Sequence, residues 1–197
     1  MQSTLSNSEF SQTSSRALPQ SIPGRFVIAF AATLFVGACA HISIPLPFTP
    51  VPLTLQNFAV LLIGLMLGPV TGFSVLALYL AEGAMGLPVF NPQGVGGLAQ
   101  IFGPTGGYLL SYPFAAAVAG WAFRSIRFSS IYVRAAFAGV LATFIIFSCG
   151  SLWLAQLLHL SASHIWTMAI APFLPGEIVK VAAAAGLATS LHRWRRA

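Results

Sequence analysis

Residues 26–81 read FVIAFAATLFVGACAHISIPLPFTPVPLTLQNFAVLLIGLMLGPVTGFSVLALYLA, which is 56 residues without one Asp, Glu, Lys or Arg. Two further uncharged runs follow, 41 residues at 83–123 and 42 residues at 135–176. A run of about 18 apolar residues is already a candidate for a membrane-spanning helix. Each of the three runs therefore predicts two or more spans, or one span with a substantial loop.

The composition of the 197-residue chain excludes a soluble globular domain. Hydrophobic residues make up 57% of the sequence and charged residues 6%, whereas the surface of a soluble domain needs roughly a quarter to a third of its residues charged. The net charge of +6 does not indicate nucleic-acid binding, because that function needs a basic stripe on a folded surface. Here the basic residues gather at the ends of apolar runs.

The positions of the basic residues predict the topology, since Lys and Arg near span ends favour the cytoplasmic side. Three clusters stand before, between and after the runs: Arg16 and Arg25, then Arg124, Arg127 and Arg134, then Arg193, Arg195 and Arg196. If all three are cytoplasmic, an even number of spans separates each pair. We therefore expect an all-α integral membrane protein with six transmembrane helices and both termini cytoplasmic, with spans at 26–44, 53–67, 70–86, 106–123, 135–158 and 176–192.

The second and third of these spans must be short. Gly68-Pro69 interrupts the apolar stretch 53–81, which is therefore either one long kinked helix or two short ones, and the charge pattern favours two. Residues 1–24 are polar and hold seven serines, which predicts a disordered cytoplasmic tail. The predicted organisation is that tail, a six-helix substrate-binding domain at 25–193, and a basic cytoplasmic tail at 194–197. The loops 45–52, 87–105 and 159–175 then share the outer face.

Glu177 and Lys180 are three residues apart at the start of the last predicted span, so they share one helix face. An ionisable residue inside a span is costly and marks a functional site by default. Lys180 can bind an incoming carboxylate there. The alternative is a structural ion pair, with the Lys180 side chain extended to the membrane interface.

Glu82 and three amides complete the polar inventory near the outer ends of the spans. Glu82 and Glu177 are the carboxylates of the predicted membrane region, and Gln56, Asn57 and Asn91 supply groups that donate and accept at once. A ligand site and a structural role both remain open for them. Glu82 can also lie in interfacial water, and an amide can join two helices by a hydrogen bond.

No enzyme chemistry is predicted. The glycine-rich segments 86–97 and 103–108 lack the Lys-Ser or Lys-Thr of a nucleotide-binding Walker loop, so the chain is not expected to hydrolyse ATP. These segments suit a lid or a re-entrant loop instead. The four histidines show no metal-ligand spacing, and no metal or other cofactor is expected.

Small residues recur every four positions in the first predicted span, at Ala29, Thr33 and Gly37. Such a face lets another helix approach closely. Docking of a partner protein and packing within the chain both explain it.

Four motifs, taken in order, resemble the BioY family, the biotin-binding S component of energy-coupling-factor (ECF) transporters. The resemblance runs from about residue 25 to residue 191. The motifs are Pro50-Val51-Pro52-Leu53-Thr54-Leu55-Gln56, Gly86-Leu87-Pro88-Val89-Phe90, Gly103-Pro104-Thr105-Gly106-Gly107-Tyr108 and Pro175-Gly176-Glu177-Ile178-Val179-Lys180.

The resemblance implies the six-helix S-component fold and high-affinity biotin uptake across the cytoplasmic membrane. It also implies a transmembrane T component and cytoplasmic ATPase subunits as partners, which use the ATP. In the family the last motif usually reads Pro-Gly-Asp with a Lys three residues on, so Lys180 carries over and Glu177 stands at the Asp position with one extra methylene. The family's Ala-xxx-Ala docking face appears here as Ala29-xxx-Thr33.

Biotin suits the polar residues already named. Its carboxylate fits Lys180, and its ureido group needs partners such as Glu177, Asn91 or Gln56. Glu82 and Tyr108, the latter from the third motif, complete the candidate substrate-binding set. Two alternatives stay open, namely an S component for another vitamin and a self-contained secondary carrier or channel.

Overall fold

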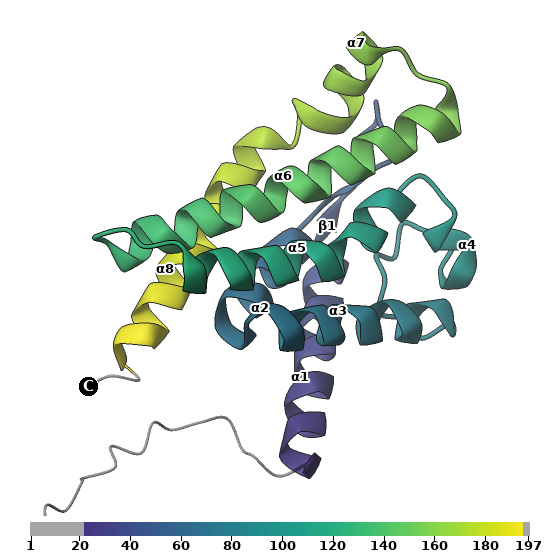
Figure 1. Cartoon of the computed structure of the whole chain (residues 1–197). Helices are drawn as coiled ribbons and strands as arrows, with labels where there is room; N and C mark the ends of the chain where they lie inside the picture. Colours follow the sequence, from purple (N-terminus) through teal and green to yellow (C-terminus); the bar gives the residue numbers. More distant parts are fainter. Residues whose placement is uncertain (1–21, 195–197) are drawn as a thin grey trace, which may run out of the picture.

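The computed structural model describes residues 22–194 and is built mainly from helices (Figure 1). The predicted tails fall largely outside these residues, as do Arg16, Arg195 and Arg196. Residues 22–24, assigned to the tail, begin the first helix. The long helices are α1 (Ile22–His41), α2 (Gln56–Leu67), α3 (Pro69–Ala84), α5 (Gly106–Ser125), α6 (Ile131–Leu158) and α8 (Leu174–Trp194).

Each predicted span coincides with one of these helices to within a few residues. The choice between one kinked helix and two short ones at 53–81 is settled for two. Gly68 separates α2 from α3 with a φ of 87°, which suits glycine, and Pro69 opens α3 at a position where its missing N–H is not needed.

Membrane-spanning capacity differs among the helices. Within residues 22–194, three stretches are long and apolar enough to cross a bilayer: Pro23–His41, α6 and α8. The apolar helices α2 and α3 have 12 and 16 residues, or about 18 and 24 Å at 1.5 Å per residue, against a hydrocarbon core of about 30 Å. The chain shields α2 accordingly, since eight of its residues are buried.

A short β-hairpin departs from the all-α expectation. Strand β1 (Ser43–Ile44) pairs antiparallel with β2 (Leu53–Thr54), with Ser43 opposite Thr54 and Ile44 opposite Leu53. The proline-rich residues 45–52 form the loop between them. The hairpin ties the end of α1 to the start of α2.

Three short elements complete the described chain. Helix α4 (Gly97–Ile101) interrupts the glycine-rich loop between α3 and α5. Helix α7 (Ala162–Ile165) and a π-helical turn, η1 (Trp166–Ile170), lead from α6 into α8. In Figure 1 these residues and α8 follow the long helix α6 as they return along the molecule.

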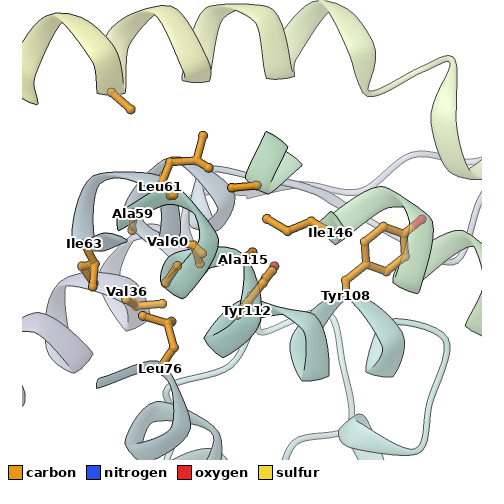
Figure 2. Packing of buried hydrophobic residues seen from close by; sticks show 14 of the residues in the cluster. Val36, Ala59, Val60, Leu61, Ile63, Leu76, Tyr108, Tyr112, Ala115 and Ile146 are labelled. Atoms are coloured by element: carbon orange, nitrogen blue, oxygen red, sulfur yellow. The ribbon is translucent and has the colours of Figure 1, made fainter. Parts of the chain in front are cut away.

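Small residues bring the central helices into close contact. A Cβ on Gly64 of α2 would meet the carbonyl oxygen of Ala116 of α5 and would lie 2.9 Å from the Ala119 Cβ. Gly120 of α5 lies just as close to the Gly68 backbone. Figure 2 shows the adjoining core, in which side chains of α1, α2, α3, α5 and α6 meet.

The outer surface of the helices is apolar. Phe26, Val70, Phe144 and Ile178 are each at least 70% exposed, whereas Gln56 is buried. Large exposed apolar side chains on α1, α3, α5, α6 and α8 fit a protein whose solvent is lipid.

The contact at Gly64 yields a matched test of this packing. We expect Gly64→Ala to lower the thermal unfolding midpoint in detergent, because the added Cβ overpacks the α2–α5 contact at a cost of about 1–3 kcal/mol. Gly186→Ala on α8 is the control, since its Cβ meets nothing within 4 Å and alanine favours a helix. Equal midpoints for the two variants would contradict the close approach.

Candidate functional site

The polar centre of the structure is an ion pair at the start of α8. Pro175 lies in the first turn, and the Glu177 N–H donates to the Phe173 carbonyl 2.9 Å away, which continues the helix. Lys180 therefore stands one turn further on, and its Nζ lies 2.6 Å from Glu177 Oε1. Both residues are buried, at 3% and 8% exposure. The expectation that they share one helix face is confirmed.

A hydrogen-bond chain joins this pair to two other helices. Asn57 of α2 donates from Nδ2 to Glu177 Oε1 at 3.0 Å, and the Tyr112 hydroxyl of α5 donates to Asn57 Oδ1 at 3.0 Å. Both Asn57 and Tyr112 are buried. Glu177 Oε1 thus accepts from a cation and an amide, and each bond to the charged carboxylate is stronger than a neutral one.

The ion pair lies in the wall of a cavity of about 40 Å³. The starts of α2, α5 and α8 supply half of the lining residues, and β2, the two long loops and two phenylalanines supply the rest. The lining residues are Val51, Pro52, Thr54, Gln56, Asn57, Asn91, Thr105, Tyr108, Leu109, Tyr112, Phe147, Phe173, Glu177 and Lys180.

The sequence profile of the BioY family matches residues 11–197. The chain belongs to the BioY family. A "probable biotin transporter BioY" from Pyrococcus horikoshii is 38% identical over 166 residues, which cover 84% of this chain and 93% of that relative. The "biotin transporter BioY" of Rhodobacter capsulatus is 34% identical over 178 residues, which cover 86% and 93%.

A solved structure shares the fold of this BioY-family chain. The crystal structure of the S-component for biotin from an ECF-type ABC transporter superposes with a TM-score of 0.78 at 25% identity, over 86% of this chain and 90% of that one. The family and the apolar helices make the chain a multi-pass protein of the cell membrane and not an enzyme.

The structure gathers five of the six predicted substrate-binding residues of this BioY-family member at one cavity. They are Gln56, Asn91, Tyr108, Glu177 and Lys180. A volume of about 40 Å³ is close to the ≈ 30 Å³ share of one liquid water, whereas pockets for small-molecule ligands hold about 300–1,000 Å³. The site is therefore narrower in this conformation than a small-molecule pocket.

Hydrogen bonds hold the other polar side chains of the cavity in place. Gln56 donates from Nε2 to the Tyr79 hydroxyl at 2.7 Å, and Tyr79 donates to the Val89 carbonyl at 2.8 Å. The Asn91 side chain accepts from the Gln93 N–H at 2.9 Å. These bonds connect α2 and α3 to the glycine-rich loop, so movement of the loop changes the surroundings of Gln56.

Glu82 lies apart from this cavity. Its Oε1 accepts a hydrogen bond from Thr33 Oγ1 at 3.1 Å, which joins α3 to α1. Glu82 is 6% exposed, so it does not lie in interfacial water. Glu82 therefore connects α3 to α1, and the substrate-binding role predicted for it stays a prediction.

The small-residue face of α1 packs inside the chain. Thr33 is fully buried, and a Cβ on Gly37 would lie 3.5 Å from the Val89 carbonyl oxygen. Ala29 packs partly against the core. Thr33 and Gly37 therefore make packing contacts within the chain, and the docking of a partner at Ala29, Thr33 and Gly37 stays a prediction.

Sequence reasoning missed Tyr112 and did not single out Asn57 as the partner of Glu177. One signal for Tyr112 exists, because Tyr108 and Tyr112 are four residues apart and therefore share a helix face. The contacts of Tyr112 with α2 come from tertiary packing, and a single sequence carries no such signal.

Proposed function

We propose that this chain is the substrate-binding S component of an ECF-type transporter that takes biotin up across the cytoplasmic membrane. The observation that supports the proposal best is the buried Lys180–Glu177 pair in the wall of a narrow cavity, in a chain whose relatives are named biotin transporters.

Lys180 is the group that suits the carboxylate of biotin. An ammonium has three donors, and Glu177 takes one of them at 2.6 Å. A second carboxylate can therefore bind Nζ while Glu177 keeps the Lys180 side chain in place. Glu177 and Asn57 are positioning residues in this arrangement.

The ureido group then lies at the other end of the site. The ion pair is too compact to serve both ends of biotin, whose carboxylate and ureido group are separated by the valerate chain and the ring. Gln56 and Asn91 offer amides that donate and accept, and Phe147 and Phe173 offer apolar walls for the thiophane ring.

Binding requires the cavity to enlarge. The proline-rich loop contributes Val51 and Pro52 to the wall, and the glycine-rich loop contributes Asn91 and Thr105. A second cavity of about 170 Å³ shares Pro52, Asn91 and Thr105 with the first. Displacement of the two loops would merge the cavities, so we assign to these loops the entry of the substrate.

The proposed topology has six spans with both termini cytoplasmic and the biotin site near the outer face. The site lies at the starts of α2, α5 and α8, whereas Arg124, Arg134 and Arg193 lie toward the opposite ends of the long helices, as the preference of basic residues for the cytoplasm requires. A T component and ATPase subunits would supply the energy, and the chain itself needs no cofactor.

The substrate assignment is tested by calorimetry on the detergent-purified chain. We expect saturable biotin binding at one site per chain, and none with riboflavin or thiamine. The wild type should prefer biotin over biotin amide by about tenfold or more, because a hydrogen bond to a charged group is worth about 1.5–3 kcal/mol. Lys180→Gln should lose this preference by binding biotin more weakly.

Two controls separate failure of the site from failure to fold. Arg127→Gln, an exposed residue outside the cavity, should keep the preference, and residual binding of biotin amide by Lys180→Gln shows that the variant is folded. If Lys180→Gln still prefers biotin over biotin amide, Lys180 does not bind the biotin carboxylate. If the folded wild-type chain does not bind biotin, the assignment of biotin as the substrate is wrong.

The topology is tested by cysteine labelling in intact cells. In a Cys39→Ser, Cys149→Ser background, a membrane-impermeant maleimide should label Ala162→Cys, which lies between α6 and η1. Ser129→Cys, between α5 and α6, should react only after permeabilisation. Both native residues are exposed in the structure. The reverse labelling pattern would show that the protein has the opposite orientation in the membrane.

A further inference from the structure

A second hollow lies at the opposite ends of the helices that form the biotin site. Its volume is about 310 Å³, and α2, α5, α6 and α8 enclose it. Leu65, Met66 and Ala188 give it an apolar wall, and Arg124 and Arg134 bring two guanidinium groups to it.

Aromatic packing fixes the position of Arg134. Its Cζ lies 4.8 Å from the centre of the Phe123 ring, and Phe123 is 7% exposed, so a rigid core side chain supports the cation. The edge of the His192 ring packs on the same Phe123 ring with centroids 6.1 Å apart. Arg134 Nε is buried and makes no hydrogen bond within residues 22–194.

Arg124 lies beside the turn between α2 and α3. Its guanidinium occupies the space that a Cβ on Gly68 would fill. Gly68 also caps the carboxyl end of α2, where exposed carbonyl groups favour a nearby cation.

Neither arginine has an anionic partner in the described part of the chain. The carboxylates there are Glu82, which accepts from Thr33, and Glu177, which pairs with Lys180. Two guanidinium groups at one hollow repel each other unless an anion lies between them. Packing on Phe123, rather than ion pairing, holds Arg134 there in advance.

We propose that this hollow binds a phosphate group, that of an anionic membrane phospholipid. The planar guanidinium donors match phosphate oxygens, and the apolar wall suits the glycerol and the first acyl carbons. Basic pockets between helices at the cytoplasmic end of a membrane protein favour such headgroups.

The test is native mass spectrometry of the full chain, delipidated and then titrated with phosphatidylglycerol, phosphatidylcholine or inorganic phosphate. We expect one retained phosphatidylglycerol per chain, several-fold preferred over phosphatidylcholine. Arg134→Gln should weaken this binding by about tenfold. Arg124→Gln, whose native residue is exposed, should weaken it as well and provides a variant with little risk of misfolding.

Arg127→Gln is the matched control, because it removes the same charge from the same end of the molecule but does not line the hollow. The titration with inorganic phosphate distinguishes the source of the group. If the chain retains inorganic phosphate but not phosphatidylglycerol, and Arg134→Gln loses that retention, the site belongs to free phosphate. Equal loss in Arg127→Gln, equal retention of phosphatidylcholine, or no binding of either phosphate source would overturn the proposal. Each readout is independent of biotin binding.

Discussion

The buried ion pair between Lys180 and Glu177 is the contact on which the site depends. Two charges inside a protein of this composition are stable only if hydrogen bonds satisfy them. Asn57 donates to the Glu177 carboxylate, and Tyr112 donates in turn to Asn57, which connects α8 to α2 and α5. The same hydrogen bonds position the side chains that a polar ligand would meet. They therefore stabilise the ion pair and also shape the cavity.

Close packing in the middle of the protein separates the two cavities, which lie at opposite ends of the helices. Gly64 and Gly120 let α2 and α5 approach backbone to backbone, and alanines fill the contacts of α6 and α8. One end of this bundle carries the Lys180 cavity, and the other carries the two arginines of the second hollow. Within residues 22–194, these two cavities thus lie at opposite ends of tightly packed helices.

The sequence predicted the helices well because charge and proline or glycine positions mark their ends. It also predicted that Lys180 and Glu177 lie together, because residues three apart on a helix share one face. It did not predict the β1–β2 hairpin, because two-residue strands carry no periodicity. It did not separate internal packing from docking for Thr33, since both uses select small residues, and the partner of Glu82 depends on a contact 49 residues distant.

The most direct test of the account is an experimental structure of the protein with biotin bound. The account predicts the biotin carboxylate within about 3 Å of Lys180 Nζ, Glu177 still bonded to Asn57, and an enlarged cavity with the proline-rich and glycine-rich loops displaced. The account would be contradicted by a structure in which the biotin carboxylate lies away from Lys180 and the cavity beside the Lys180–Glu177 pair is not enlarged.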